Sequence, residues 1–365
     1  MPDTILRPDP APDLESSLRV CLLVGNNNIR HCGVKDYTYR LAEALAEHGI
    51  EAELHAPADW KVGSFLELRR RLRFGRFDVL HVQYPAIGFR YSLLPHLAGL
   101  SGIAPATCVT LHEYSRLPSL QRLSTHLFRL SSRTMLFTTD EERQSFMGGT
   151  SKGRRSFQVI PIASNVPEAP PADRTEPTVL YFGQIRPEKG IEAFLALASL
   201  SVTSAATIRF QIVGAYLPRH EEYLRGLRRN APENVEWIVG ADLNEVARRM
   251  SSAMAAYLPF PDGASYRRGS MIGALVNGLP VISSCSKATP DELASVILKA
   301  DTPQQALAHL RLLQDTPERR VKVSAACRAL GLHFCWGSVA EAHRLLYERL
   351  RSSEGRTHES RRFSP

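Results

Sequence analysis

The sequence predicts an α/β protein in which two Rossmann-like domains follow one another and face a central cleft. Three observations predict this fold class. Short apolar runs alternate with segments of helical periodicity along most of the chain, a proline-rich break interrupts the alternation, and the same pattern then restarts. The length of 365 residues also favours two domains, because a single hydrophobic core stops growing at about 250–300 residues.

The first domain is expected over residues 18–166, after a polar lead-in at residues 1–17 that is rich in proline and aspartate. It opens with a continuous apolar run at residues 19–24 (RVCLLV), as expected of a parallel strand buried on both faces. A polar loop ending in Gly33 follows, and apolar residues then recur at helical spacing as far as Gly49. Further strands are predicted at residues 51–55, 77–82, 107–111, 134–138 and 159–161.

Residues 167–177 (PEAPPADRTEP) are predicted to form the linker, because proline fits neither a helix interior nor a central strand. The second domain is expected over residues 178–330, a helix returning to the first domain over 331–350, and a disordered basic tail over 351–365. The second domain has predicted strands at residues 179–182, 208–213, 235–239, 255–258 and 280–283. Its predicted helices lie at residues 191–200, 221–229, 243–251 and 269–277.

The chain carries a formal net charge of +8, which suits anionic partners such as phosphorylated ligands or anionic lipid. Much of this charge lies in residues 69–73 (RRRLR) and in the tail from Arg351. A solvated helix face and a disordered end are the more ordinary interpretation of both segments, and weak contact with the inner face of an anionic membrane is the alternative. No nucleic-acid-binding motif occurs in the sequence, and no nucleic acid partner is expected.

The compartment expected from the sequence is the cytoplasm. No apolar run is long enough to span a bilayer, and the N-terminal segment lacks the apolar core of a secretion signal. The six cysteines are scattered and form no C-x-x-C pair, so neither a disulfide framework nor a zinc site is predicted.

Two polar loops that follow strands of the second domain carry the residues expected to bind a phosphate. In the first loop, a buried strand ends at Gly183 and Gln184, a turn carries Arg186 and Lys189, and Gly190 leads into a helix. Glycine permits close backbone approach, a helix start offers free N–H groups to an anion, and lysine supplies a point charge. A solvated turn with basic residues is the alternative interpretation.

The second loop, residues 262–270 (DGASYRRGS), repeats this arrangement after the strand predicted at residues 255–258. Arg267 and Arg268 precede Gly269 and Ser270, which open the next helix, so the same physics predicts an anion site here. Ser270 could equally serve only as a helix cap. Two such loops in one domain can bind one diphosphate, and this coincidence favours the functional interpretation.

The first domain contributes a loop with Asn28, Gly33 and Lys35 near the end of its first strand, and two histidines, His81 and His112, near the ends of later strands. A histidine beside an apolar strand is more often structural than catalytic, but His112 lies just past a strand, where ligand clefts form. The sequence contains no H-E-x-x-H, D-x-D, P-loop or G-x-S-x-G motif. This argues against a zinc protease, a metal-dependent transferase, a P-loop NTPase and a serine hydrolase.

These blocks, in this order, resemble the family-4 retaining glycosyltransferases of the GT-B architecture, over about residues 19–349. Residues 32–38 (CGVKDYT) are similar to the family's glycine-rich first loop, and residues 182–190 to its donor-phosphate block, in which Lys189 matches the family lysine. The other matching blocks are residues 41–45 (LAEAL), 78–81 (DVLH), 109–112 (VTLH), 278–281 (GLPV) and 334–340 (FCWGSVA), with Tyr347.

The resemblance implies transfer of a sugar from a nucleotide-sugar donor to a hydroxyl acceptor, with retention and with no metal or other cofactor; acceptors of the family are often lipid-linked. Polysaccharide, glycoconjugate and specialised-metabolite synthesis all fit this reaction. It further implies that Lys189, Arg268 and His112 act in catalysis, the first two stabilising the leaving diphosphate and His112 binding the donor sugar. A non-catalytic nucleotide-sugar-binding protein and a sugar epimerase of the same architecture are the alternatives.

The sequence departs from the family at three positions of the expected donor site. Where the family carries two glutamates around the donor helix, counting back from Gly278 gives Ser265 and Gly273. Gln184 stands where an arginine is usual. We therefore expect phosphate binding to depend on Arg267, Arg268 and the amide groups of Gly269 and Ser270.

Overall fold

The computed structural model describes residues 17–25, 32–89, 92–101, 106–148, 156–172, 177–204 and 207–362. The chain divides into two compact units. The first comprises residues 1–161 together with 339–365, and the second comprises residues 162–338.

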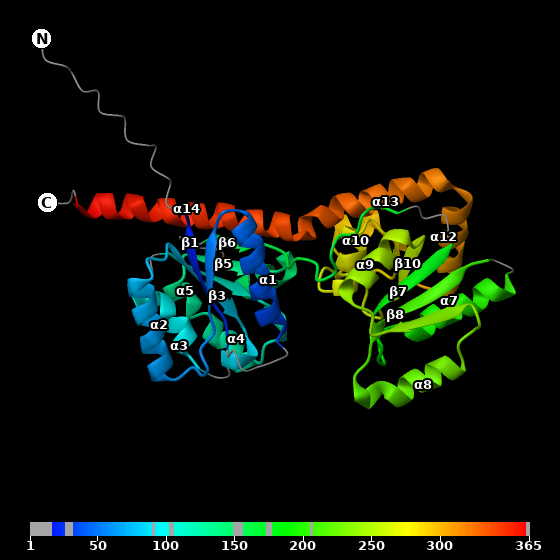
Figure 1. The fold of residues 1–365 in the computed structure, drawn as a ribbon, viewed down its shortest axis with the longest axis horizontal. Coiled ribbons are helices and arrows are strands. Elements are labelled where there is room, and N and C mark those ends of the chain that lie inside the picture. The colour runs from blue at the N-terminus through cyan, green and yellow to red at the C-terminus, as the bar shows by residue number, and fades with distance from the viewer. Residues whose placement is uncertain are drawn as a thin grey trace, which may run out of the picture. The chain divides into compact units, whose positions relative to one another are not determined.

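Within the described residues, the first unit contains a six-stranded sheet in which every pair of neighbouring strands is parallel (Figure 1). The strand order is β2-β1-β3-β4-β5-β6. The strands are β1 (Arg19–Leu23), β2 (Glu51–His55), β3 (Val79–Tyr84), β4 (Ala106–Leu111), β5 (Thr134–Phe137) and β6 (Ser156–Val159). Every residue of β3 and β4 is buried, as expected of central strands covered on both faces. The chain reverses its direction of travel across the sheet between β1 and β3, which makes this the switch point of the first unit.

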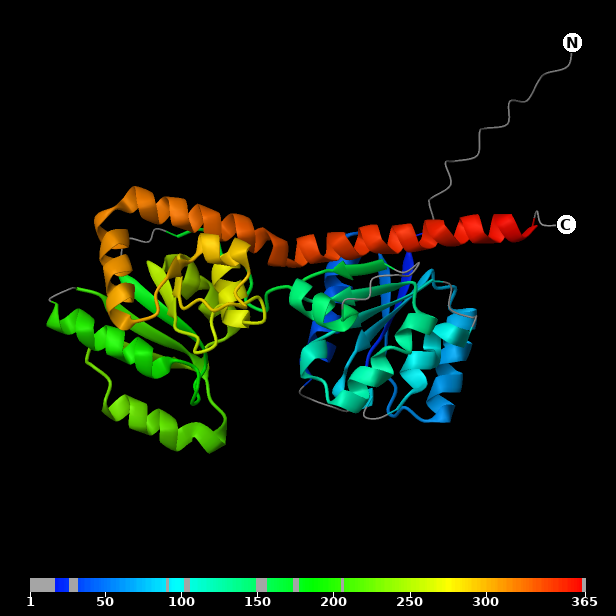
Figure 2. The same cartoon turned by 180° about the vertical axis from the view of Figure 1, so that it is seen from behind.

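The helices of the first unit cover both faces of this sheet (Figures 1 and 2). They are α1 (Gly33–Glu47), α2 (Val62–Phe74), α3 (Leu94–Leu97), α4 (Ser119–Thr125), α5 (Phe128–Ser131), α6 (Asp140–Met147) and α14 (Trp336–Arg362). From Val339 onward α14 belongs to this unit, and its Tyr347 and His343 are buried. The sequence analysis predicted a disordered tail after residue 350, whereas the backbone is helical as far as Arg362.

The second unit repeats the architecture: its described residues form another six-stranded parallel sheet, in the order β12-β11-β10-β7-β8-β9. The strands are β7 (Thr178–Gln184), β8 (Arg209–Ala215), β9 (Val235–Val239), β10 (Ala255–Leu258), β11 (Val281–Ser283) and β12 (Leu298–Lys299). The helices are α7 (Ile191–Thr203), α8 (Glu221–Arg229), α9 (Leu243–Ser252), α10 (Gly269–Val276), α11 (Asp291–Val296), α12 (Pro303–Asp315) and α13 (Pro317–Gly331). The predicted fold class of two parallel α/β sheets is thus confirmed. Sequence analysis assigned no elements to the stretch that forms α11, β12, α12 and α13.

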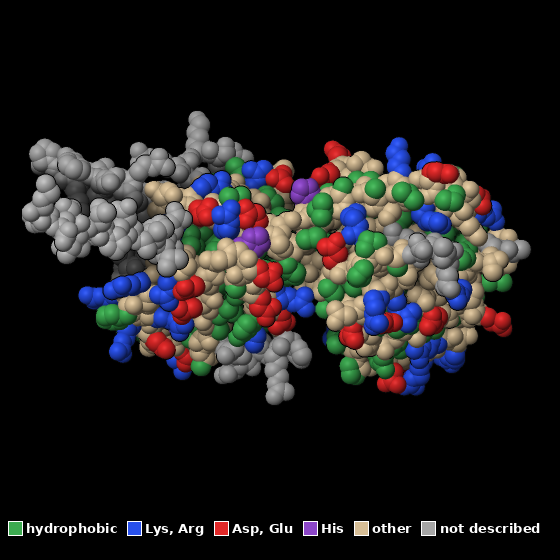
Figure 3. Space-filling view, turned by 45° about the horizontal axis from the view of Figure 1, so that its top comes forward, with side chains coloured by type: hydrophobic (Ala, Val, Ile, Leu, Met, Phe, Trp, Pro, Cys, Tyr) green, Lys and Arg blue, Asp and Glu red, His purple; other side chains and the backbone are tan. Residues whose placement is uncertain are grey.

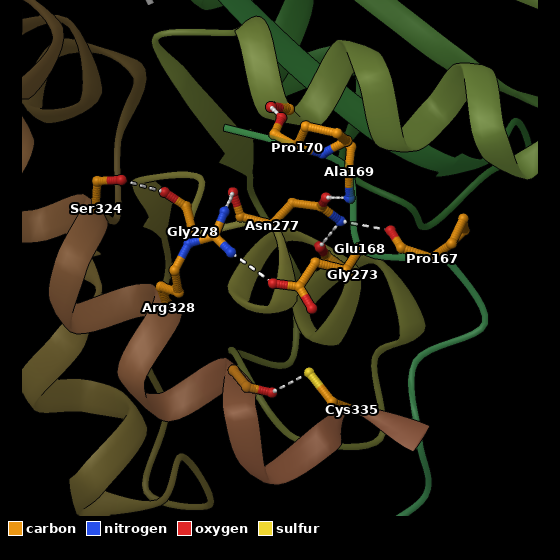
Figure 4. Close-up of polar contacts among 12 residues, drawn as sticks. Pro167, Glu168, Ala169, Pro170, Gly273, Asn277, Gly278, Ser324, Arg328 and Cys335 are labelled. Carbon is orange, nitrogen blue, oxygen red and sulfur yellow. Dashed lines mark hydrogen bonds and ion pairs between the residues drawn. The ribbon is translucent and has the colours of Figure 1, made fainter. Parts of the chain in front are cut away.

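The proline-rich segment predicted as a free linker is packed on the second unit. Val166 and Ala169 are buried, and the side chain of Asn277, which directly follows α10, donates to the carbonyl oxygen of Pro167 (3.1 Å) and accepts from the N–H of Ala169 (2.9 Å) (Figure 4). Arg328 of α13 pairs with Glu168 at 2.6 Å. Proline excludes helix and central strand from this segment but does not prevent packing, because the Asn277 amide satisfies its backbone groups. The chain therefore crosses between the units before Ile162 rather than over residues 167–177.

Among the helices of the described residues, none has both the length and the apolar character needed to cross a membrane.

Candidate functional site

The two loops predicted to bind phosphate lie at the switch point of the second sheet. From β7 the chain builds β8 and β9 on one side and then returns to place β10 on the other side of β7. The loops follow the carboxyl ends of β7 and β10, which are neighbouring strands. This is where open parallel α/β sheets bind their ligands.

The loop after β7 is fixed by close backbone packing. Glu188 and Gly190 both have left-handed backbone conformations, with φ of 66° and 76°. A Cβ atom at Gly190 would come within 2.0 Å of the carbonyl oxygen of Pro259, so glycine is required there for the loop after β7 to lie against the segment after β10. The buried hydroxyl group of Tyr181 donates to the carbonyl oxygen of Lys189 at 3.2 Å, which holds the lysine backbone over the end of β7.

The loop after β10 is anchored to the segment after β11. Gly263, at φ 89°, leaves no room for a Cβ atom beside Ser286. The N–H of Ala264 donates to Ser284 (2.9 Å), and the carbonyl oxygen of Ala264 accepts from the Thr289 hydroxyl (2.9 Å). These contacts hold the loop before the arginine pair in one conformation.

Arg268 is the last residue before α10 and is mostly buried, with 17% of its side chain exposed. Its guanidinium group pairs with Asp262 and lies 4.9 Å from the centre of the Phe260 ring, a favourable cation–π distance. Gly269 is exposed and Ser270 is half-buried, and N–H groups of a first helical turn lack intrahelical partners. A fixed cation and free amides thus occur together at the start of α10.

Arginine residues of both loops affect the pKa of one buried phenol, that of Tyr181. Burial raises the pKa of Tyr181 above its usual value and Glu192 adds to this effect, while Arg186 and Arg268 lower it. Arg186 of the first loop and Arg268 of the second thus act on the same buried hydroxyl group, and Gly190 and Pro259 bring the two loops into contact. The structure therefore brings together the two loops that the sequence separates.

The remaining residues that were predicted to bind the donor differ in how exposed their side chains are. Gln184 is exposed, Gly183 and Lys189 are half-buried at the end of β7, and Ser265 accepts from the N–H of Arg268 at 3.2 Å. Gly273 is different: it is buried, and a Cβ atom there would meet Val166 at 3.0 Å. This position faces the packed proline-rich segment, so the absence of a side chain at Gly273 is explained by packing.

In the first unit, the predicted histidines belong to a buried hydrogen-bonded network. Nδ1 of His81 lies 2.6 Å from the Tyr347 hydroxyl on α14, and its Nε2 lies 2.7 Å from the Thr110 hydroxyl on β4. Gln83 lies between the histidines, with its Oε1 atom 2.8 Å from Nε2 of His112. All five side chains are buried.

Burial keeps the histidines of this region neutral near pH 7. It lowers the pKa of His112 to about 4, with a smaller contribution from His343, and it lowers the pKa of His343 to about 4. The pKa of His81 is also well below its usual value, because of burial and then because of His343 and His112. His343 enters the group from α14, with its ring centre 5.6 Å from that of His81.

The sequence analysis missed Gln83, Thr110 and His343. Gln83 follows His81 by two residues on the same strand, and period-two alternation places both side chains on one face of the sheet. That signal was available in the sequence. The contact with α14 could not be predicted in this way, because more than 250 residues separate α14 from β3 in the chain.

The loop at the end of β1 is described only in part. Asn28 lies outside the described residues. Gly33 begins α1 and is exposed, with open space around a Cβ atom, and Lys35 is half-buried in the first turn. The backbone of this loop approaches another segment closely at Gly25 and not at Gly33: a Cβ atom at Gly25 would come within 2.8 Å of the backbone nitrogen of Gly88. Gly25 thus allows the loops after β1 and β3 to meet at the switch point of the first sheet.

No group of three or more histidine, cysteine, aspartate or glutamate side chains among the described residues is placed to hold a metal ion. Metal independence stays a prediction.

Comparison with known proteins links the second unit to a family. Residues 176–315 match the family described as glycosyl transferases group 1. No curated protein matches the chain by its sequence.

Solved structures share the fold of most of the chain at low sequence identity. A glycosyltransferase from Rickettsia africae ESF-5 is similar with a TM-score of 0.66 at 10% identity, over 92% of this chain and 99% of that chain. Alr3699/HepE from Anabaena in complex with UDP gives a TM-score of 0.64 at 12% identity, over 91% of this chain and 100% of that chain. A chain of the GtfA/B complex gives a TM-score of 0.56 at 11% identity over 79% of this chain, which spans 61% of that chain's length.

At these identities the structural likeness establishes the architecture alone: the chain has the GT-B fold of these solved structures. Its residues 176–315, the greater part of the second unit, match the group 1 glycosyl transferases.

Proposed function

We propose that this protein transfers a sugar from a nucleotide-sugar donor to a hydroxyl acceptor with retention of configuration, without a metal ion. The observation that carries the proposal is the meeting of two cation-bearing loops at the switch point between β7 and β10. The UDP-containing complex of Alr3699/HepE, which shares the fold, supports a nucleotide-sugar as the ligand of this site.

In the proposed reaction the donor diphosphate lies against the start of α10 and the turn that carries Lys189. Negative charge grows on the diphosphate as the bond to the sugar breaks, and Arg268, Lys189 and the first-turn amides of α10 stabilise it. Arg268 suits this role because Asp262 and the Phe260 ring already hold its side chain in place, so little reorganisation is needed in the transition state. Arg186 and Arg267 extend the positive charge around the same position.

His112 is proposed to bind a hydroxyl group of the donor sugar. The side chain is neutral near pH 7 because its pKa is about 4, so it acts as a hydrogen-bonding group and not as a cation. The bond between the anomeric carbon and the diphosphate breaks while the acceptor oxygen bonds to that carbon on the same face, and the departing diphosphate takes the proton of the acceptor hydroxyl group. The chain's residues then serve mainly to position the reactants and stabilise charge.

The test is incubation of the full chain with a panel of nucleotide-sugars, with and without EDTA, followed by separation of nucleotides and sugars. We expect free nucleoside diphosphate to form in an acceptor-dependent way and to form equally with EDTA. Epimerised donor without nucleotide release would identify an epimerase, and binding without either product would identify a non-catalytic binding protein. Full loss of turnover with EDTA, restored by Mg²⁺, would contradict metal independence.

We further propose weak contact of the first unit with an anionic membrane, which would suit a lipid-linked acceptor. Large apolar side chains are exposed on α2, α4 and α5: Phe74 at 72%, Leu120 at 73%, Leu123 at 68% and Leu130 at 64%. These helices, with α3 between them, form one contiguous layer, and α2 adds exposed arginines, among them Arg70 and Arg73. On the face drawn in Figure 3, outside the grey areas, basic and acidic side chains are interspersed, so the excess positive charge is not gathered there.

Each basic residue near an anionic surface contributes about 1 kcal/mol, and exposed leucines add apolar insertion. Co-sedimentation with vesicles that contain phosphatidylserine should therefore decrease with salt and decrease further in the Leu120→Ser/Leu123→Ser variant. No binding by the wild type at low salt would contradict this contact.

A further inference from the structure

The side-chain amide of Gln83 lies between His81 and His112 of the first unit and contacts both rings. The Gln83 side chain is fully buried. Its Oε1 atom lies 2.8 Å from Nε2 of His112, and its Nε2 atom lies 3.1 Å from Nε2 and 3.3 Å from Nδ1 of His81.

The chemistry of an amide gives this contact a direction. A carbonyl oxygen only accepts, so Nε2 of His112 must donate and therefore carries the proton. His112 is neutral near pH 7, so its other ring nitrogen, Nδ1, keeps a lone pair. None of the described residues makes a hydrogen bond to that nitrogen.

On the other side of the amide, the NH₂ group of Gln83 faces the ring of His81 and can donate to the one ring nitrogen that carries a lone pair. His81 is fixed in turn by the hydroxyl groups of Tyr347 and Thr110, at 2.6 and 2.7 Å, which can donate or accept as the ring requires. The chain of contacts thus runs from α14 through β3 to the residue that follows β4.

The titratable groups that face His112 come from three elements. Tyr37 of α1 packs its ring edge-on against His112 at 5.4 Å, His81 approaches from β3, and His343 acts from α14. Burial raises the pKa of Tyr37 above its usual range, so this phenol is neutral. None of these groups is charged near pH 7, and Gln83 alone of these neighbours is shown to hydrogen-bond the His112 ring.

We propose that Gln83 is a positioning residue that holds His112 in the tautomer protonated on Nε2, so that Nδ1 is a hydrogen-bond acceptor for a sugar hydroxyl group. The hydroxyl group as the ligand rests on the proposed transferase function. The tautomer itself is a property of the free protein and can be measured without substrate.

The first test is nuclear magnetic resonance of the full chain labelled with ¹⁵N at histidine, with the His112 signals identified from a His112→Gln variant. We expect wild-type His112 to show the tautomer protonated on Nε2 at pH 7.5. Gln83→Leu, of similar volume, should give a mixture of tautomers. Thr107→Val, a buried position of β4 outside this chain of contacts, should leave the His112 tautomer unchanged.

The second test is kinetic. Gln83→Leu should lower kcat by roughly tenfold, the size of one hydrogen bond, with a smaller change in KM for the donor. Gln83→Glu places a carboxylate beside Nε2, which favours the charged imidazolium, so the acid limb of the pH–rate profile should move to higher pH. A residue with a purely structural role would lower the amount of folded protein without moving this limb.

A wild-type spectrum with His112 protonated on Nδ1 would overturn the proposal, as would an unchanged tautomer in folded Gln83→Leu. The wild-type spectrum decides the matter even if that variant does not fold. Absence of transferase activity in the wild type would contradict the proposed function and leave the spectroscopic result valid, so the two failures are distinguishable.

Discussion

The backbone of Gly190 lies against the carbonyl oxygen of Pro259 so closely that a Cβ atom at Gly190 would come within 2.0 Å of that oxygen. This contact joins the loop after β7 to the segment after β10. It explains how cations that are far apart in the sequence come to act on one buried phenol.

Gly190→Ala should therefore weaken donor binding and destabilise the second unit. The change adds a backbone clash to a left-handed conformation at φ 76°, and strain of this kind costs about 1–3 kcal/mol. Urea unfolding and donor titration measure the two effects. The matched control is Gly226→Ala within α8, where a Cβ atom meets nothing within 4 Å; it should be neutral or stabilising, because alanine is the better helix former. Equal effects of the two variants would contradict a special role for Gly190.

Lys189→Ala and Arg268→Ala should each slow turnover more than they weaken donor binding. Charge on the leaving diphosphate is greater in the transition state, so each lost contact should cost about 1.5–3 kcal/mol, or more than tenfold in kcat/KM. Because both cations would act on the same diphosphate, the free-energy costs of the two substitutions should not add up in the double variant. Arg70→Ala on exposed α2 is the control and should keep wild-type kinetics. Wild-type turnover in both folded single variants would place the anion site elsewhere.

Stability of the first unit should decrease as the pH falls from about 6.5 towards 4. His112 and His343 have a pKa of about 4 in the folded protein but about 6.5 when unfolded, so the unfolded chain binds more protons in this window. Each group then contributes a loss of up to about 1.4 kcal/mol per pH unit. Urea unfolding at pH 7.5 and pH 5 measures this, and His343→Gln should reduce the pH dependence whereas the exposed His333→Gln should not. An unfolding midpoint that does not change with pH would contradict the prediction.

Asn277→Leu should destabilise the second unit by about 1–3 kcal/mol, because it leaves the N–H of Ala169 and the carbonyl oxygen of Pro167 buried without their partner. Asn230→Ala, at the exposed end of α8, serves as the control. If both variants unfold at the same urea concentration as the wild type, the proline-rich segment is not held by Asn277.

The architecture was predictable because parallel strands buried on both faces leave continuous apolar runs in the sequence, as at residues 19–24 and 179–182. The position of the two loops that carry glycine and cations was predictable as well, since each follows such a run; that they bind phosphate stays a prediction. Contacts between distant segments were not predictable. The approach of Gly190 to Pro259 depends on which strands become neighbours, and the fit of Val166 against Gly273 depends on where the proline-rich segment packs.

The inclusion of α14 in the first unit has a consequence for synthesis on the ribosome. Its Tyr347 and His343 are fully buried in that unit, so the unit lacks part of its interior until α14, which follows the whole second unit in the sequence, has been made. The second unit is continuous in the sequence, over residues 162–338, and is complete once that stretch has left the ribosome. Domains usually complete their folding in the order of synthesis; here the order is reversed, and the half that begins first finishes last.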